Sequence, residues 1–328
     1  MYLLENKQFK SEIVPKTFAE SEMTEAHMEN ILAANLNMIF NEESMIVIGK
    51  QVKNATNGRS DLTVIDQNGN IVLIEIKRDK ADAVSRKESF ESQAIRYAAS
   101  YATIKTIEEA VQIIYASYLR KLRPLDFHSD QSAYDYGLAT LNEFLDKNHS
   151  RTSFNQKQRI ILVASDFDVQ TLSASTWLKQ NGIDISCFKM VPYELQGHHF
   201  VNMEKVLPLA TDEDFLVNLY VKSSPTKVMT ASRTKRVLPK IKDMLEWKVV
   251  KEEDILVAKD RDIKAVLLRN GNVNFNNEEM TMQAWLRGVY GWASVHTYVF
   301  AIHKESGKSL SEIREEYMQN SEEFQEMD

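Results

Sequence analysis

The sequence predicts an α/β protein with a mixed central sheet flanked by helices, followed by a small C-terminal α+β domain. A strand hairpin near residues 62–76 and a strand–helix–strand pattern over 159–190 predict the mixed sheet. The regular pattern weakens over 216–239, which separates this region from a shorter, aromatic-rich end. We therefore expect a first domain over 1–215, a basic linker or surface element over 216–245, and a small module over 246–328.

The early elements follow from the spacing of apolar residues. Thr24 is a suitable N-cap for a helix over 24–40, where apolar side chains recur at helical intervals. Residues 45–48 form a short predicted strand. The hairpin strands over 62–65 and 71–76 come next, and the residues between them are typical of a turn: Gln67, Asn68, Gly69 and Asn70.

Helices alternate with strands through the middle of the chain. A helix is expected over about 88–103, followed by largely helical sequence to residue 145. The apolar run 159–164 has strand length, a helix over 169–180 ends before Gly182, and 183–190 forms another strand. Two acids, Asp166 and Asp168, lie where ligands bind in α/β folds, although helix capping explains them more simply. For the pair His198 and His199 we expect a loop.

Composition excludes several classes of protein. The 328 residues are 43% hydrophobic and 27% charged, which is typical of a packed globular chain. One cysteine, Cys187, excludes an intrachain disulfide framework and is interpreted as a small core residue. No apolar run is long enough to span a membrane, no signal peptide is evident and no Walker-type loop occurs. We expect a soluble, cytoplasmic protein that needs no ATP and has no membrane partner.

Charge is distributed unevenly along the chain. The net charge of −7 argues against bulk nucleic-acid coating, but a local basic surface is compatible with it. Between Lys222 and Lys242 basic residues recur without one acid, and this run includes Arg233, Lys235 and Arg236. We interpret it as a contact for a nucleic-acid backbone; a solvated surface is the alternative. The acidic C-terminal tail is more simply a solvated helix face or a frayed end.

The hairpin carries an unusual set of charges. Glu75 and Lys77 share one face of their strand because side chains alternate along a strand. A three-residue loop that ends at a left-handed Gly69 sets Asp61 opposite Glu75, whereas a two-residue loop sets it opposite Ile76. We expect the three-residue loop. Both faces of the hairpin are mostly apolar, so the strands should lie in the middle of a covered sheet.

Two acids and a lysine in such a place favour metal-assisted chemistry. Paired carboxylates suit a hard divalent cation that binds phosphate oxygens, and Lys77 would steady the attacking water or the charge of the transition state. The alternative is a cross-strand salt bridge, which a bare Glu-x-Lys pattern usually indicates. The flanking Arg59 and Arg78, which would contact DNA, favour the functional interpretation.

These residues resemble the active-site motif of the PD-(D/E)XK, or restriction-endonuclease-like, nuclease superfamily. The ordered set is Glu29, Asp61, Glu75, Lys77, Gln93 and Tyr97. The last two resemble the Gln-x-x-x-Tyr helix of the RecB-like branch, and the stretch from Ile48 to Tyr97 is similar to NucS-type endonucleases. Ser60 replaces the proline of the motif. The resemblance covers roughly 20–195, and residues 262–317 resemble small modules of restriction and modification proteins.

The resemblance implies a role for each matching residue. Asp61 and Glu75 would bind a metal with the carbonyl of Ile76, and Glu29 would bind it directly or through water. Lys77 becomes the catalytic lysine. The helix pair Gln93 and Tyr97 would orient Lys77 or touch the DNA backbone. Each of the last two has a plain alternative, namely a surface amide and a core aromatic.

Together these features predict a DNA endonuclease that depends on Mg²⁺ or Mn²⁺ and acts in DNA repair or restriction and defence. A homodimer is compatible with this prediction. The alternative is a catalytically inactive nucleic-acid-binding or interaction protein that keeps the nuclease fold. Clustered acids argue against it, because a surface that only binds phosphates has no use for them.

Overall fold

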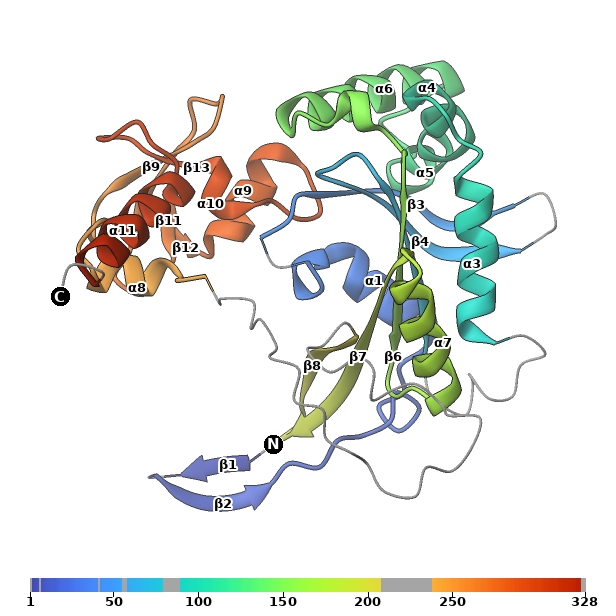
Figure 1. Ribbon diagram of the computed structural model, residues 1–328, viewed down its shortest axis with the longest axis horizontal. Helices are drawn as coiled ribbons and strands as arrows, with labels where there is room; N and C mark the ends of the chain where they lie inside the picture. Colours follow the sequence, from blue (N-terminus) through green and yellow to red (C-terminus); the bar gives the residue numbers. More distant parts are fainter. Residues whose placement is uncertain are drawn as a thin grey trace. The chain divides into compact units, whose positions relative to one another are not determined.

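The computed structural model describes residues 2–5, 7–40, 42–54, 58–78, 89–207 and 238–325 (Figure 1). The chain forms two compact units. One comprises Met1–Ile39 and Ile46–Arg233, and the other comprises Phe40–Met45 and Thr234–Asp328. Each unit is built on its own β-sheet and is described by itself.

A six-stranded mixed sheet forms the centre of the first unit. Its strands lie in the order β3-β4-β5-β6-β7-β8. β4 and β5 form an antiparallel hairpin, β5, β6 and β7 run parallel, and β8 returns antiparallel. The prediction of a mixed α/β sheet is therefore confirmed. The bounds are β3 (Met45–Lys53), β4 (Arg59–Asp66), β5 (Ile71–Lys77), β6 (Gln158–Ala164), β7 (Asp184–Leu195) and β8 (His198–Leu207), with a separate hairpin of β1 (Tyr2–Glu5) and β2 (Gln8–Glu12).

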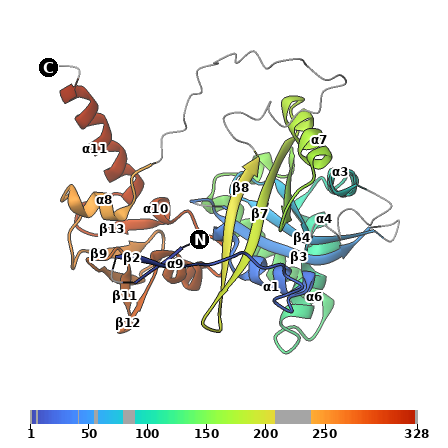
Figure 2. The same cartoon turned by 90° about the horizontal axis from the view of Figure 1, so that it is seen from below.

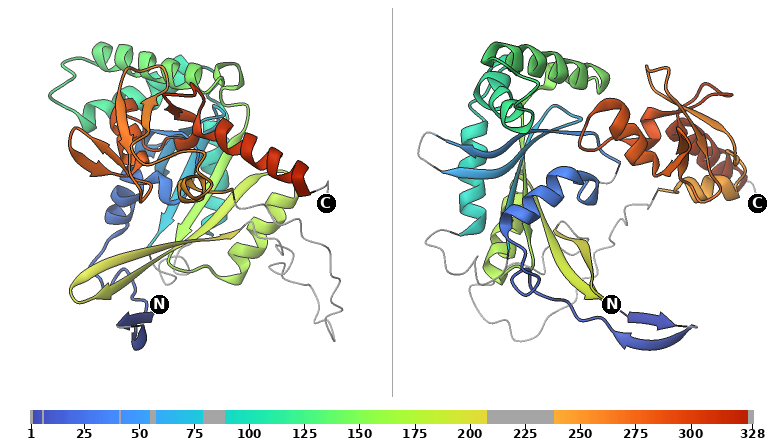
Figure 3. Two further views of the ribbon diagram at one scale, coloured as in Figure 1. Left: turned by 90° about the vertical axis from the view of Figure 1, so that its left-hand side faces the viewer. Right: turned by 180° about the vertical axis from the view of Figure 1, so that it is seen from behind.

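Helices cover both faces of this sheet. α1 (Glu25–Ala34) lies on one face, and α3 (Phe90–Tyr101) and α7 (Val169–Gln180) lie on the other (Figures 1 and 3). All of β5 is buried, and in β4 Arg59 alone is exposed. The hairpin strands thus lie inside a covered sheet, as their apolar faces predict.

The predicted helical stretch after α3 is a series of separate helices and helical turns. It contains α4 (Ile107–Ala110), a π-helical turn η2 (Val111–Tyr115), α5 (Ala116–Leu122), α6 (Asp130–Lys147) and a 3₁₀ turn η3 (Arg151–Ser153). Thr106 and Ser129 cap α4 and α6 by accepting hydrogen bonds from backbone N–H groups. The π-helical turn replaces regular α-helix between α4 and α5, a local irregularity that is often found near functional sites.

Several boundaries differ from the sequence prediction. The first helix ends at Ala34 rather than residue 40, because Asn35 leaves helical geometry and a 3₁₀ turn η1 (Leu36–Met38) follows. The strand predicted over 45–48 continues to Lys53.

The loop expected at His198 and His199 is wrong, because both residues pair in β8. Gln196 and Gly197 both have positive φ and form a tight two-residue hairpin turn, which extends β7 and β8 into a long ribbon (Figure 2).

Helix capping, the simpler expectation for the two acids before α7, holds for Asp168 but not for Asp166. Asp168 is the N-cap of α7 and accepts a hydrogen bond from the Thr171 N–H at 2.8 Å. Asp166 forms an ion pair with Lys189 at 2.5 Å. Cys187 is fully buried in β7, and burial raises the pKa of its thiol to about 12. The thiol is therefore a core group, as the sequence predicts.

The second unit contains a five-stranded antiparallel sheet in the order β12-β11-β10-β9-β13. Its aromatic side chains form a core in which Trp292 stacks near Tyr290 and meets Phe300 edge-on. The element bounds are α8 (Ile241–Glu246), β9 (Ile255–Ala258), β10 (Lys264–Leu267), β11 (Val273–Phe275), β12 (Glu278–Met280), α9 (Met282–Tyr290), α10 (Thr297–Phe300), β13 (Ala301–His303) and α11 (Leu310–Gln325).

Candidate active site

The loop between β4 and β5 sets the register of the hairpin. Gly69 has a φ of +82°, and the Asp66 N–H donates to the Asn70 carbonyl at 3.1 Å. The paired residues run from Ile65 opposite Ile71 to Leu62 opposite Ile74. The three-residue loop is therefore confirmed, and the same register sets Asp61 across from Glu75.

Leu62 is the last residue of β4 that pairs with β5, and the next contact between the two strands is made by the side chain of Asp61. Its Oδ2 accepts a hydrogen bond from the Ile76 N–H at 2.7 Å. From the other side, the Lys77 Nζ donates to the Ile76 carbonyl at 3.0 Å and lies 5.3 Å from the centre of the Phe90 ring. The backbone of Ile76 thus holds Asp61 and Lys77 together at the end of β5.

The side chain of Gln51 links Glu29 on α1 to Asp61. The Gln51 Nε2 donates to Glu29 on α1 and to the Asp61 Oδ1 at 3.2 Å. Glu29 also pairs with the Lys50 Nζ at 3.4 Å. Gln51 has a φ of +53°, a conformation that costs a non-glycine residue about 1–2 kcal/mol. The fold therefore holds this amide between the two acids against a backbone preference.

The Gln-x-x-x-Tyr pair on α3 reaches the same end of the sheet. The Gln93 Nε2 donates to the Glu75 Oε2 at 3.3 Å and lies 3.4 Å from the Tyr97 hydroxyl, one helical turn away. That hydroxyl accepts from the Arg59 N–H at 2.8 Å. A Cβ at Gly58 would lie 2.6 Å from the Tyr97 ring, so a glycine is needed for this approach. Tyr97 is thus both a buried aromatic and an anchor for the start of β4.

All four charged residues of the cluster are deeply buried. The exposed fractions are 3% for Glu29, 8% for Asp61, 0% for Glu75 and 2% for Lys77. Burial raises the pKa of Asp61, and the charge of Lys77 opposes that effect. Burial also raises the pKa of Glu29, with a further contribution from the nearby Asp61 charge. The site therefore destabilises its own ionised acids and favours the approach of another positive charge.

The donor set fits a hard divalent cation. Asp61, Glu75 and the Ile76 carbonyl offer oxygen ligands of the kind that Mg²⁺ and Mn²⁺ prefer. Glu29, Asp61 and Glu75 do not bring one oxygen each within 4.8 Å of one another. Repulsion between like charges opposes a closer approach unless a cation neutralises it. The Gln51 amide bridges Glu29 and Asp61, and the Gln93 amide donates to Glu75.

Another group of potential metal ligands lies in the second unit. Within the part of the chain that the structure describes, Asp254, His303 and Glu305 bring their ligand atoms within 4.8 Å of one another. The His303 Nε2 faces the Asp254 Oδ2 at 3.2 Å, while its Nδ1 meets the Ser306 hydroxyl at 2.9 Å. This trio was not predicted from the sequence, because Asp254 precedes β9 whereas His303 ends β13 and Glu305 follows it, so Asp254 is distant in the chain from the other two.

Of the five residues predicted to bind DNA, the structure describes Arg59 and Arg78. The Arg59 side chain is exposed beside the cluster, and Arg78 is half-buried. The Arg78 N–H donates to the Glu25 Oε1 at 3.4 Å. The three basic residues predicted further along the chain lie outside the described residues: Arg233, Lys235 and Arg236.

Sequence reasoning missed part of the cluster. Lys50 and Gln51 were recognised only as part of a similar stretch, and Glu25, whose charge further raises the pKa of Asp61, was not recognised. Tyr101 was also missed; its hydroxyl meets those of Ser60 and Thr63 at 2.6 Å each. Glu25 lies four residues before Glu29 on α1, a spacing that could have identified it. For Gln51 the strained φ is visible only in the folded chain.

No described helix is both long enough and apolar enough to cross a membrane. Comparison of the chain with protein-family models and with curated proteins found no match. The arrangement of buried acids, lysine and amides at the end of β4 and β5 is therefore the basis for assigning a function.

Proposed function

We propose that the chain is a divalent-metal-dependent DNA endonuclease that hydrolyses phosphodiester bonds, acting in DNA repair or in restriction and defence. The carrying observation is the buried cluster in which Asp61 and Lys77 meet on the backbone of Ile76 while Gln93 holds Glu75. A covered sheet rarely accommodates three acids and a lysine without a functional reason, because burying charge is costly.

The proposed chemistry uses the residues that the resemblance to PD-(D/E)XK nucleases names. Asp61, Glu75 and the Ile76 carbonyl would hold Mg²⁺ or Mn²⁺, which activates water and neutralises charge on the phosphate. Lys77 would stabilise negative charge that develops on the scissile phosphate. The Gln51 amide lies between Glu29 and Asp61, so Glu29 would bind the metal through water.

The rival proposal is a catalytically inactive nucleic-acid-binding or interaction protein with the same fold. It accounts for exposed basic groups such as Arg59. It gives no role to the buried acids Asp61 and Glu75, which lie together at one end of β4 and β5. An inactive relative would be free to replace Asp61 or Glu75 with neutral residues and so to avoid the desolvation of charge.

Incubation with labelled nucleic acids tests the proposal directly. Single-stranded, double-stranded and branched DNA, and RNA of the same sequence, are incubated with Mg²⁺, with Mn²⁺ and with chelator. We expect metal-dependent cleavage of DNA by the wild-type protein and at least a 100-fold lower rate for Asp61→Asn. Asp254→Asn serves as the matched control, because it removes an acid from the other potential metal-binding group. Cleavage that Asp254→Asn abolishes and Asp61→Asn leaves intact would assign the chemistry to the second unit.

A further inference from the structure

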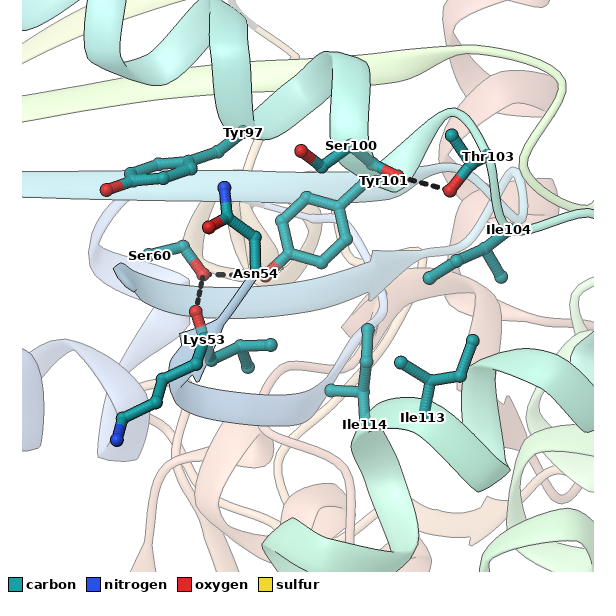
Figure 4. Close-up of a pocket in the computed structure, with 11 residues that line it drawn as sticks. Lys53, Asn54, Ser60, Tyr97, Ser100, Tyr101, Thr103, Ile104, Ile113 and Ile114 are labelled. Atoms are coloured by element: carbon teal, nitrogen blue, oxygen red, sulfur yellow. Dashed lines mark hydrogen bonds between the residues drawn. The ribbon is translucent and has the colours of Figure 1, made fainter. Parts of the chain in front are cut away.

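A hollow of about 350 Å³ lies beside the cluster, between the C-terminal half of α3 and the π-helical turn η2 (Figure 4). Its floor and walls are largely apolar: Val52, Tyr97, Tyr101, Ile104, Ile113 and Ile114. Hydroxyl and amide groups of Asn54, Ser60, Ser100 and Thr103 occur among these side chains. Such a mixture suits a flat group with apolar faces and polar edges.

A second hollow of about 300 Å³ adjoins the first and shares Val52, Lys53, Ile113 and Ile114 with it. Three lysines line it, namely Lys50, Lys53 and Lys121, and no acid lines it. The Lys50 ammonium pairs with Glu29, so Lys53 and Lys121 are the lysines that would meet phosphates in this hollow. Lys53 and Lys121 are exposed to solvent. A chain of negative groups could therefore follow the lysines while a flat group enters the apolar hollow.

Both hollows are lined in part by residues that contact or adjoin the acids of the proposed active site. Gln51, which bridges Glu29 and Asp61, lines the second hollow. Ser60, which precedes Asp61 in β4, and Tyr97, which lies one turn from Gln93, line the first. A nucleic-acid strand that presents one phosphate to the cluster would thus bring a neighbouring nucleotide to the hollows.

We propose that the apolar hollow binds one unpaired nucleobase of the substrate and that the lysine-lined hollow binds the phosphates beside it. This inference rests on the proposed function and deepens it, because it names the substrate class as nucleic acid with at least one unpaired nucleotide near the cut. A paired base cannot enter, since it would have to leave its duplex stack first. Base contact through aromatic and apolar side chains is tolerant of sequence, so no strict sequence preference is expected.

Binding of single-stranded DNA with one abasic site, moved one nucleotide at a time along the strand, tests the proposal. Affinities are measured by fluorescence anisotropy in chelator, so that no cleavage occurs. We expect one position, or two adjacent ones, at which the abasic site weakens binding about 5- to 100-fold, the loss expected for one stacked base. Losses within twofold at every position would overturn the proposal.

Variants then locate the contact. Ile113 is 61% exposed and lines both hollows, so Ile113→Asp should abolish the position-dependent loss and weaken binding. Val169→Asp is the matched control, because Val169 is 66% exposed on the same unit and lines neither hollow. An Ile113→Asp protein whose abasic profile equals that of Val169→Asp would also overturn the proposal.

The lysines require a separate measurement. The double variant Lys53→Ala, Lys121→Ala should flatten the dependence of log affinity on log salt by about 1.4, or 0.7 for each lost phosphate contact on a single strand. The control double variant Lys157→Ala, Lys179→Ala should leave the slope unchanged. An unchanged slope in the first variant would remove the phosphates from the lysine-lined hollow.

A parallel cleavage assay separates this proposal from the proposed function. A position-dependent abasic profile without metal-dependent cleavage would keep the base-binding hollow and reject the nuclease. Metal-dependent cleavage with a flat abasic profile would keep the nuclease and reject the hollow as a base-binding site.

Discussion

At the scale of single residues, two neutral amides donate hydrogen bonds to the three acids of the cluster. Gln51 donates to Glu29 and Asp61, and Gln93 donates to Glu75. An amide satisfies a carboxylate oxygen without cancelling its charge, whereas a lysine or arginine in the same place would neutralise it. The cluster therefore keeps negative charge in a buried place, which is the electrostatic condition for cation binding.

Glu75→Ala and Lys77→Ala should fail for different physical reasons. Glu75→Ala removes a proposed ligand, so both Mn²⁺ affinity and cleavage should fall. Lys77→Ala removes a positive charge next to Asp61, so Mn²⁺ binding should persist or tighten while cleavage drops about 100-fold or more. Calorimetric Mn²⁺ titration beside a cleavage assay separates the two. Wild-type cleavage by Lys77→Ala at saturating metal would reduce this lysine to a structural ion pair.

The raised pKa of Asp61 predicts a pH-dependent effect on stability. The folded state holds the Asp61 proton to a higher pH than the unfolded chain does, so this group makes stability fall as pH rises from about 3.8 through the raised value. Asparagine does not titrate. The melting temperature of Asp61→Asn relative to wild type should therefore become more favourable from pH 4 to pH 8.

This comparison is made in chelator, by differential scanning fluorimetry. The lost hydrogen bond of the variant adds an offset that does not vary with pH, so the trend is the diagnostic quantity. A difference that stays constant between pH 4 and pH 8 would contradict the raised pKa.

At the scale of elements, α3 and the start of β4 depend on each other. Tyr97 packs against Gly58 and accepts from the Arg59 N–H, and the same helix carries Gln93 to Glu75. Tyr101 adds hydroxyl contacts to Ser60 and Thr63 further along β4. The helix therefore fixes the strand end on which Asp61 lies, so a change in this packing should reach the cluster.

Gly58→Ala tests that dependence. Its Cβ would lie 2.6 Å from the Tyr97 ring, so the helix or the strand must shift, and a loss of about 1–3 kcal/mol in stability is expected. Cleavage should fall about tenfold or more because Gln93 moves with Tyr97. Gly288→Ala is the control: a Cβ there meets nothing within 4 Å, and alanine inside α9 should be neutral or stabilising. Equal melting temperatures for the two variants would show that α3 tolerates the added methyl group.

At the scale of the whole molecule, an acidic chain needs local basic groups to bind nucleic acid. The net charge is −7, which disfavours long-range attraction to DNA, so the proposed contacts would have to come from clusters of lysine and arginine. The lysine-lined hollow is one such cluster in the first unit. The basic run between Lys222 and Lys242, which spans the boundary at Thr234 between the two units, is another, known from the sequence alone.

Replacing Arg233, Lys235 and Arg236 by alanine tests the basic run. If the run contacts the DNA backbone, binding should weaken similarly for unrelated sequences, and the salt slope on duplex DNA should flatten by up to about 2.7, or 0.9 for each contact. Anisotropy at several salt concentrations measures this. An unchanged slope would leave the run as a solvated surface.

Local rules predicted the hairpin well because its determinants are adjacent in sequence. Gly69 can adopt positive φ at the end of a three-residue loop, and that fact alone sets Asp61 opposite Glu75. Alternating side chains then place Lys77 with Glu75, and the apolar faces predict burial on both sides. By the same reasoning, Asp168 as a helix cap and Cys187 as a core thiol required no tertiary information.

The sequence by itself determined the order of elements from α1 to β7, the mixed α/β class and the acids and lysine of the hairpin, because short-range geometry sets each of them. Only the tertiary structure decided which side chains meet across long separations. Gln51 reaches Glu29 and Asp61 from a strained backbone, and the hollow beside Tyr97 exists because a π-helical turn packs opposite α3. These contacts depend on how separate elements pack, and no local spacing in the chain encodes that packing.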